Sequence, residues 1–378
     1  MIKKIFTLIL VASTLSVNAQ ERCGTEVITK QIMANNPDYA LARAKVNIQT
    51  EQWIKDHPNH SEKTIITIPV VVHVVYSING QGNPVGNISD AQIQSQIDVL
   101  NKDYRRTNID HIMTPNVWQS IAADCEIEFC LAATDPNGQP TNGINRIETT
   151  HGQFGMDSDI HTSSAGGADD WPNDHYLNIW VCNLGSGLLG YATPPSGWIG
   201  DGDGVVIGYN YFGTIGTLTA PYNKGRTTTH EIGHWLNLEH LWGAWGTCGN
   251  DDVSDTPKQE VENYGVPSFP HNINSCGTTN PNGDMFMNYM DYTNDAVMNL
   301  FTNGQKTRML AAIDQYRPNM LSHNLCNEAT NILEMDITKK ELVKIIDILG
   351  RETNKQNTNT PLFYIYNDGS VEKKIIVE

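Results

Sequence analysis

The stretch His230-Glu231-Ile-Gly-His234-Trp-Leu-Asn-Leu-Glu-His240 carries the residue types of a catalytic metal site. Two histidines four positions apart lie on one face of a helix, so both imidazoles converge on one point. His240 reaches that point only if the helix ends and the chain turns back, and Asn237 lies where this bend is needed because asparagine tolerates positive φ. Three neutral imidazoles leave zinc an open position for water, which is typical of a catalytic site.

Glu231 directly follows the first histidine, which predicts that it is a general base. One bound zinc ion would polarise a water molecule and the scissile carbonyl. Glu231 would accept the proton of that water and pass it to the leaving amine. We therefore expect hydrolysis of peptide bonds in proteins or peptides without a covalent intermediate.

The chain of 378 residues has 42 acidic and 25 basic side chains, a net charge of −17. Such a charge repels nucleic acid and anionic lipid, which excludes these partners. Cationic partners, including calcium and basic peptides, are favoured.

Residues 1–19 have the three parts of a signal peptide. Lys3 and Lys4 precede the apolar run IFTLILVA, and Val17-Asn18-Ala19 ends in a small-residue cleavage site. The run is too short to span a bilayer, and no other stretch is apolar enough for a transmembrane segment. We expect a secreted, extracellular protein in which disulfides persist. Its seven cysteines are an odd number, so at least one thiol is left for another role, and Cys23 is the candidate.

Four parts follow one another along the chain. Residues 20–62 are polar and helix-permissive and end in a loop-like stretch, which predicts a detachable pro-segment after the signal peptide. Residues 63–326 form the predicted catalytic domain, and residues 327–378 are a lysine-rich tail with β patterns, predicted to be a small separate β domain.

The catalytic domain is predicted to be mixed α/β. The β-branched run 64–76 indicates a central strand, with shorter strands at 127–132, 176–184 and 204–209. A capping box of Ser89 and Gln92 precedes one helix, and a final helix lies within 302–321. We expect a twisted, largely parallel sheet with helices in an upper half and an irregular lower half beyond His240, with the substrate cleft between them. His73, inside the central strand, is expected to be a satisfied core residue rather than a ligand.

Two further stretches give the domain its resemblance to a known family. Asn288-Tyr-Met290-Asp-Tyr292 is similar to the methionine turn of the metzincin metalloproteases, and CGNDDVSDTP, residues 248–257, follows the zinc helix as in their pappalysin family. The resemblance covers about residues 64–326. It implies a secreted zinc endopeptidase with a metzincin-like fold, in which Met290 packs under the metal.

The resemblance also implies roles for two residues beside this turn. Tyr292 would donate to the developing oxyanion, or else pack the loop. Asp295, five residues after Met290, would form the base of the pocket for the residue that follows the scissile bond and would select Arg or Lys. The alternative for Asp295 is a solvated surface carboxylate.

The family further implies calcium and a disulfide in the lower half. Hard oxygen ligands for a structural calcium ion would come from Asp251, Asp252, Asp255 and Thr256. The alternative is a turn rich in aspartate for its own hydrogen bonds. Cys248 and Cys276 are the expected family disulfide. The sequence does not pair the remaining four, which are Cys125, Cys130, Cys182 and Cys326.

Cys23 lies in the stretch Arg22-Cys23-Gly24-Thr25, and pro-segments of this family begin in a similar way. A thiolate is a strong zinc ligand, so Cys23 is expected to occupy the water position and keep the precursor latent. The alternative is an idle or disulfide-bonded cysteine. Cleavage before basic residues would make Ile54-Lys55 and Glu62-Lys63 candidate self-processing bonds in the predicted linker.

The tail resembles the C-terminal sorting domain of type IX secretion in Bacteroidetes, through DILGRE and the ending PLFYIYNDGSVEKKIIVE. This implies the type IX machinery as a partner and release or surface attachment after processing. A small carbohydrate- or protein-binding module is the alternative. For the whole protein, the alternatives are a narrow peptide-processing enzyme and a secreted binding or matrix protein whose metzincin domain has lost turnover.

Overall fold

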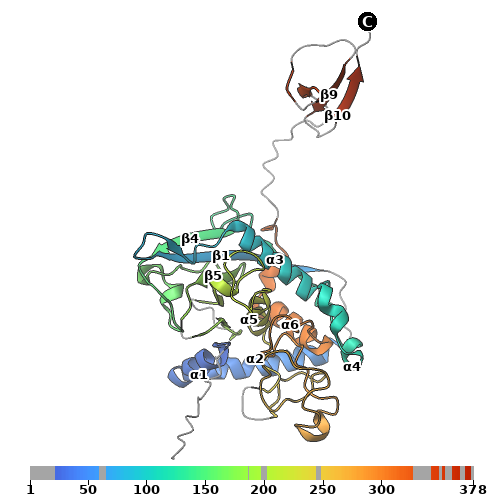
Figure 1. The fold of residues 1–378 in the computed structure, drawn as a ribbon. Coiled ribbons are helices and arrows are strands. Elements are labelled where there is room, and N and C mark those ends of the chain that lie inside the picture. Colours follow the sequence, from blue (N-terminus) through green and yellow to red (C-terminus); the bar gives the residue numbers. More distant parts are fainter. Residues whose placement is uncertain are drawn as a thin grey trace, which may run out of the picture. The chain divides into compact units, whose positions relative to one another are not determined.

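The computed structural model describes residues 22–58, 65–185, 187–196, 202–243, 248–326, 342–348, 351–353, 360–366 and 371–375 (Figure 1). The predicted signal peptide and the Glu62-Lys63 bond lie outside these residues. The chain divides into two compact units, residues 1–328 and 329–378. None of the described helices is long and apolar enough to cross a membrane.

A mixed, mainly parallel sheet forms the upper half of the first unit. Its path runs β2-β1-β5-β7-β6, and β3 and β4 also pair with β1. Strands β3, β4 and β5 are parallel to β1, and β7 is parallel to β5, whereas β2 and β6 are antiparallel to their neighbours. The bounds are β1 (Ile66–Ile78), β2 (Pro84–Val85), β3 (Ile127–Leu131), β4 (Ile144–Thr149), β5 (Leu177–Cys182), β6 (Gly190–Ala192) and β7 (Gly204–Gly208). The predicted fold class is confirmed.

Strand β1 is buried on both faces, which is why its sequence is a nearly continuous run of β-branched residues. Within it, His73 is fully buried and satisfied on both ring nitrogens. Its Nε2 lies 2.9 Å from Asn178 Oδ1, its Nδ1 lies 3.2 Å from Asn145 Nδ2, and its ring stacks on Trp180. The ring is therefore neutral, and burial lowers its pKa to about 4. The prediction of a core histidine is confirmed.

Helices cover the sheet and carry the metal motif. The bounds are α1 (Thr25–Asn35), α2 (Pro37–Asp56), α3 (Asp90–Tyr104), α4 (Asn116–Gln119), α5 (Arg226–Trp235) and α6 (Asn303–Tyr316). The 3-10 turns are η1 (Ile109–Met113), η2 (Asp159–His161), η3 (Ser163–Ala165), η4 (Tyr209–Tyr211), η5 (Gly277–Thr279) and η6 (Pro318–Met320). Ser89 caps α3 by accepting from the Gln92 amide at 3.2 Å, as predicted. The Gln92 side chain donates instead to the carbonyls of Tyr209 and Phe212, so the box is only half formed.

The predicted pro-segment is largely helical. Helix α1 lies beside β6 and α2 packs along α6 (Figure 1). Helix α2 continues to Asp56, so the Ile54-Lys55 bond lies inside its last turn. The prediction that this bond lies in a linker is therefore wrong, because the helix extends further than the polar sequence indicated.

The lower half, between His240 and Thr302, has neither an α-helix nor a named strand among its described residues. The Cys248–Cys276 disulfide closes part of it, as predicted. A second disulfide, Cys130–Cys326, joins β3 to the end of the first unit. The other three thiols, Cys23, Cys125 and Cys182, are free and buried.

The second unit is a three-stranded antiparallel sheet in the order β10-β9-β8. Its bounds are β8 (Leu342–Ile346), β9 (Pro361–Tyr366) and β10 (Val371–Ile375). The predicted β patterns of the tail are present, and the NDG turn between the last two strands lies outside the described residues.

Candidate metal centre and substrate cleft

A sharp turn at the end of α5 brings the third histidine back to the helix. The Leu238 amide donates to the Gly233 carbonyl and the Asn237 amide to the His234 carbonyl, each at 2.9 Å. Asn237 has φ 70°, so the pair of bonds forms a Schellman motif with asparagine in the left-handed position. The predicted bend at Asn237 is present, and it places His240 opposite the helix.

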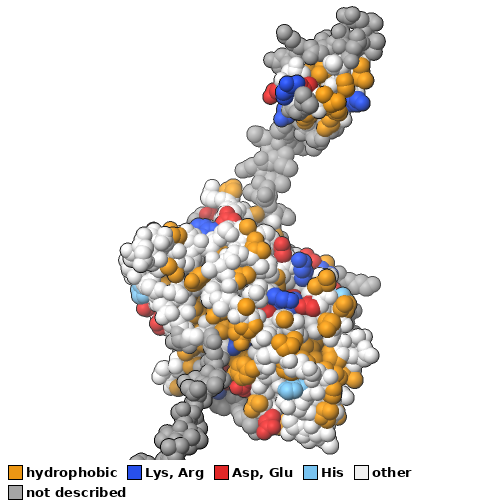
Figure 2. Space-filling model, viewed as in Figure 1, with side chains coloured by type: hydrophobic (Ala, Val, Ile, Leu, Met, Phe, Trp, Pro, Cys, Tyr) orange, Lys and Arg blue, Asp and Glu red, His pale blue; other side chains and the backbone are white. Residues whose placement is uncertain are grey.

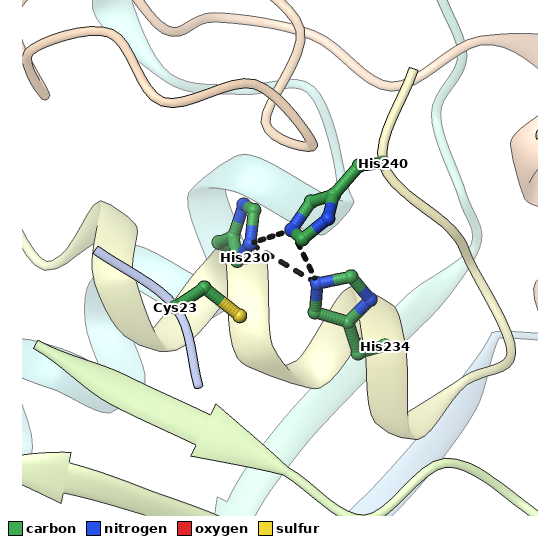
Figure 3. Close-up of side chains that lie close together, drawn as sticks. All are labelled: Cys23, His230, His234 and His240. Atoms are coloured by element: carbon green, nitrogen blue, oxygen red, sulfur yellow. Dashed lines mark hydrogen bonds between the residues drawn. The ribbon is translucent and has the colours of Figure 1, made fainter. Parts of the chain in front are cut away.

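The three imidazoles meet at one point (Figure 3). Their Nε2 atoms lie 3.0 to 3.2 Å apart. The Nδ1 of His230 lies 2.7 Å from the Tyr289 carbonyl and that of His234 lies 2.8 Å from the Leu238 carbonyl, so both Nδ1 atoms carry the proton. Their Nε2 atoms are then acceptors that face each other, which requires a cation between them. Burial lowers the pKa of His230 and of His234, which keeps these rings neutral.

The third imidazole, His240, is oriented by a residue of the predicted pro-segment. Its Nδ1 lies 3.0 Å from Glu26 Oε1. Although burial acts to raise it, hydrogen bonds from His240 and Lys30 lower the pKa of Glu26 to about 2. A carboxylate behind a ligating imidazole fixes its tautomer and raises its basicity. Trp242 stacks on the other side, with ring centroids 4.4 Å apart.

Cys23 supplies a fourth donor to this group. Its Sγ and one nitrogen from each histidine all lie within 4.8 Å of one another, and its side chain points toward the three rings (Figure 3). Burial and the neighbouring Glu231 raise the pKa of the thiol. A thiolate here therefore needs a cation beside it. Three imidazoles and one sulfur are a donor set that zinc accepts in tetrahedral sites.

Glu231 is buried beside the metal centre. Its Oε2 accepts from Thr25 Oγ1 at 3.0 Å and lies 3.2 Å from Cys23 Sγ. Burial raises its pKa to about 8. Both contacts come from the predicted pro-segment, so the carboxylate of the predicted general base is covered in this form of the chain.

Met290 lies directly under α5, as the methionine turn predicted. It is fully buried, and a Cβ added to Gly233 would come within 2.5 Å of its Sδ. A side chain at Gly233, between the two helical histidines, would therefore have to displace the methionine.

Tyr292 borders the metal group. Its ring centroid lies 4.9 Å from that of His240, and its hydroxyl lies 3.5 Å from the Cys23 carbonyl oxygen. The hydroxyl therefore faces a carbonyl in the cleft, the kind of group that a peptide substrate presents.

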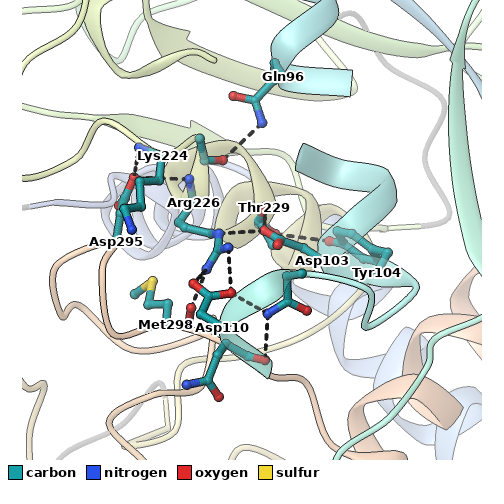
Figure 4. A network of polar contacts seen from close by, with 12 residues as sticks. Gln96, Asp103, Tyr104, Asp110, Lys224, Arg226, Thr229, Asp295 and Met298 are labelled. Carbon is teal, nitrogen blue, oxygen red and sulfur yellow. Dashed lines mark hydrogen bonds and ion pairs between the residues drawn. The ribbon is translucent and has the colours of Figure 1, made fainter. Parts of the chain in front are cut away.

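Asp295 is fully buried beside the start of α5, so it is not a solvated surface residue. Its Oδ2 accepts from the backbone amides of Lys224 at 2.8 Å and Arg226 at 3.3 Å (Figure 4). Burial raises its pKa and the Arg22 guanidinium acts against this shift. Its Oδ1 lies 3.4 Å from Arg22 Nη2.

The side chain of Arg22 lies next to Asp295. Its Nη1 donates to the Thr293 carbonyl oxygen, and its guanidinium carbon lies 4.8 Å from the centre of the Tyr222 ring. Arg22 thus contacts a carboxylate, a carbonyl and an aromatic face, which together suit a guanidinium.

A buried ionic network holds the start of α5 in place (Figure 4). Arg226 lies 2.9 Å from Asp103 and 3.2 Å from Asp110, and Thr229 donates to Asp103 at 2.8 Å. These contacts fix α5 against α3, and with it the amides that hold Asp295.

The four predicted calcium ligands are engaged in hydrogen bonds or ion pairs within the protein. Thr256 Oγ1 donates to Asp251 at 2.7 Å, whereas Asp255 accepts from Thr302 Oγ1 at 2.6 Å and the Gly304 amide at 2.9 Å and so caps α6. Asp252 lies 3.8 Å from Arg308. Burial raises the pKa of Asp251 to about 7.

Sequence reasoning missed four residues of the site. Arg22, Thr25 and Glu26 flank Cys23, and Trp242 follows His240 by two positions. The only sequence signal for these residues was that they lie close to the motifs. The partners of Arg22, Thr25 and Glu26 are more than 200 positions away in the sequence.

Three comparisons show which known proteins this chain is similar to. The Peptidase_M43 model, described as pregnancy-associated plasma protein-A, matches residues 161–314. An extracellular metalloprotease of Arthroderma otae is 32% identical over 259 residues, covering 67% of this chain and 79% of that protein. One of Pyricularia oryzae is 28% identical and covers 81% of this chain and 93% of that protein.

Solved structures of related proteins are also similar to this chain. A promirolysin variant of Tannerella forsythia is 48% identical, with a TM-score of 0.70, and covers 79% of this chain and 97% of that chain. Mature mirolysin of the same organism, in complex with a cleaved peptide, is 51% identical, with a TM-score of 0.66, and covers 70% of this chain and 99% of that chain.

The chain belongs to the Peptidase_M43 family. The resemblance to the pappalysin metzincins is thereby confirmed, and the protein is a zinc metalloendopeptidase that acts on protein or peptide substrates. The converging side chains of His230, His234 and His240 are a group that could hold the catalytic metal of such a peptidase. Figure 2 shows acidic and basic side chains scattered among uncharged ones on the face in view, so the net charge of −17 is not gathered there.

Proposed function

We propose that His230, His234 and His240 hold the catalytic zinc and that Glu231 is the general base. The observation that carries this is the convergence of three acceptor nitrogens, 3.0 to 3.2 Å apart, next to a buried carboxylate. Zinc, when bound, supplies a Lewis acid that polarises water and the scissile carbonyl. Glu231 holds the proton of that water and delivers it to the leaving amine. Tyr292 donates a hydrogen bond to the developing oxyanion.

The test is hydrolysis of a denatured protein by the processed enzyme and by Glu231→Gln, with zinc content measured on both. Activity should fall by about 10²- to 10⁴-fold in the variant while zinc stays bound. Equal activity in both proteins would rule out Glu231 as the base. Bound zinc without turnover in the processed wild type would favour the alternative of a secreted binding or matrix protein.

We also propose that residues 20–62 form an inhibitory pro-segment and that Cys23 is its zinc ligand. Arg22 contacts Asp295, Cys23 lies beside the three histidines, and Thr25 donates to Glu231. The longer coverage by promirolysin than by mature mirolysin, 79% against 70% of this chain, supports such a segment. In the full-length precursor, Cys23→Ala should shorten the time to activity. A variant that stays as latent as the wild type would argue against the switch.

The Asp295 pocket is proposed to select Arg or Lys after the scissile bond. The proposal is supported by Arg22, whose guanidinium contacts the Asp295 carboxylate, a backbone carbonyl and the Tyr222 ring. Cleavage of a peptide library by the processed enzyme should precede basic residues. In Asp295→Asn that preference should fall by about tenfold or more, because a charged partner is replaced by a neutral one. An apolar preference in the wild type would defeat the proposal.

The loop after the zinc helix is proposed to bind structural calcium through Asp251, Asp252, Asp255 and Thr256. The acid-rich loop, in which Asp251 is buried, motivates the proposal, although Asp255 caps α6 in this form of the chain. A chelator that removes calcium and spares zinc should lower the melting temperature. An unchanged melting curve, with no calcium found by metal analysis, would leave only the aspartate-rich turn.

We propose further that the protein is secreted and that residues 327–378 are a type IX sorting domain, removed or replaced by an anchor at the cell surface. The signal peptide motif and the extracellular relatives support secretion. The three-stranded sheet of the tail is compatible with a small separable domain. A passenger fused to residues 327–378 should be exported by a type IX host. Retention of the passenger in the cell would favour a binding module instead.

A further inference from the structure

Helix α2 packs against the rest of the first unit through one face of regularly spaced residues. Its buried residues recur at intervals of four and three positions, and they are Tyr39, Arg43, Val46, Thr50 and Trp53. This spacing gives a single stripe along a helix. The stripe begins 16 positions after Cys23, so it is a contact surface separate from the segment that covers the metal group.

Arg43 is the charged centre of that stripe and is 4% exposed. Its Nη1 donates to Asn237 Oδ1 at 3.0 Å and to the Pro195 carbonyl oxygen, and its Nη2 donates to Glu239 Oε1 at 3.2 Å. One guanidinium thus joins the segment after β6 to the bend that carries His240.

Both ends of the Asn237 side-chain amide form hydrogen bonds with α2. Its Oδ1 accepts from Arg43, and its Nδ2 donates to Thr50 Oγ1 at 3.2 Å. The backbone carbonyl of Asn237 accepts from Arg308 Nε of α6 at 2.6 Å. Glycine adopts φ 70° with less strain, so the bend alone does not explain an asparagine here. The contacts with Arg43 and Thr50 do.

The rest of α2 is anchored on α6. Trp53 Nε1 donates to Asp314 at 2.7 Å, and Arg308 Nη2 donates to Asn47 at 2.7 Å. Tyr316 donates to Gln49 at 2.9 Å. These bonds do not involve Cys23 or the residues next to it.

We propose that the bend at Asn237 and Glu239 is the docking site for α2, and that this contact is a second lock that keeps the pro-segment on the enzyme independently of Cys23. The partner that the site recognises is an amphipathic helix with an arginine at its centre and a hydroxyl two turns later. The proposal rests on the proposed latency of the precursor. Loss of the Cys23 contact alone then leaves the segment bound and the cleft partly covered.

The experiment compares full-length precursors that carry Arg43→Ala, Thr50→Val, Cys23→Ala, or Lys45→Ala as a control on the exposed side of α2. Each is activated with a protease that cleaves after Glu, whose sites none of the changes alters. Onset of activity is followed together with amide hydrogen exchange in α2. All four positions lie in the segment that is removed, so the processed enzymes have one sequence and equal final specific activity shows that each precursor folded.

Arg43→Ala should shorten activation about tenfold or more and raise exchange in α2 by a similar factor, because a buried charged donor is lost. Thr50→Val keeps the shape of the side chain and should show a smaller effect in the same direction. Lys45→Ala should match the wild type. Cys23→Ala combined with Arg43→Ala should activate faster than either single change, since the two contacts are separate.

Wild-type activation and exchange in both Arg43→Ala and Thr50→Val would overturn the second lock. The same holds if the double variant activates no faster than Cys23→Ala. If Arg43→Ala does not reach the same final specific activity as the other proteins, its precursor did not fold correctly. The activation and exchange of Thr50→Val then decide whether the second lock exists. If Cys23→Ala activates at the wild-type rate and Arg43→Ala activates faster, the cysteine switch is rejected and the docking site is retained. The two proposals can therefore fail separately.

Discussion

The two halves of the catalytic unit are built in different ways. In the upper half, β1, β5 and β7 are buried on all sides and packed by apolar side chains. The lower half shares this apolar core through residues such as Met285 and Leu300, and a disulfide and buried carboxylates add cross-links between its loops. Asp284 accepts from Asn280 at 2.6 Å and from Asn272 at 2.8 Å. Burial of apolar area tolerates many sequences, whereas the lower half depends on particular partners at particular positions.

The largest effect on stability is expected in the upper half. Ile179→Ala, at a fully buried position of β5, should cost about 2 to 5 kcal/mol of unfolding free energy through a cavity in the core. Ile179→Val is the matched control and should cost about 0.5 to 1.5 kcal/mol. Urea denaturation measures both. Equal, small losses would mean that the sheet is not the main source of stability.

Removal of the lower-half disulfide should have the next largest effect. The Cys248→Ser, Cys276→Ser double variant opens a loop whose ends are 28 positions apart in the sequence. It should lose about 3.5 kcal/mol of unfolding free energy. Hydrogen exchange should rise in the lower half first and leave β1 protected. Equal deprotection of both halves would show that they unfold as one body.

Acid should weaken the upper half through His73. Its folded pKa is lowered to about 4 by burial, below the unfolded value of about 6.5, so its contribution is present above pH 6.5 and is lost as the pH falls toward 4. The loss should reach about 3 kcal/mol at most. Thermal melts between pH 7 and pH 4 measure it, and His73→Gln should flatten the dependence. A slope unchanged in that variant would assign the acid sensitivity elsewhere.

The smallest effect is expected from one amide of the lower half. Asn280→Ala removes the shortest donor to Asp284 and should cost about 1 kcal/mol, because the other donors remain. Urea denaturation next to an exposed control, Asn137→Ala, gives the difference. A cost as large as that of Ile179→Ala would remove the distinction between the two halves.

Sequence patterns predicted the elements that are long and periodic. The apolar run of β1, the capped helix α3 and the helical part of α6 were all found because burial imposes a regular spacing. Strands β2, β4 and β6 were missed. Two of them have at most three residues, and β4 is half exposed, so none of the three carries a strong apolar pattern.

The site was predictable where its residues share one stretch of chain. The three histidines, Glu231 and the bend at Asn237 follow from spacing alone. The contacts of Arg22, Thr25 and Arg43 join positions about 150 or more residues apart, which no local pattern encodes. The same reason hid the Cys130–Cys326 pairing.

The most direct test of the account is X-ray absorption at the zinc edge, measured on the full-length precursor and on the processed enzyme. The account predicts three imidazole nitrogens and one sulfur around zinc in the precursor, with the sulfur lost on processing and absent from Cys23→Ser. A precursor whose zinc has no sulfur neighbour, or fewer than three imidazoles, would contradict it.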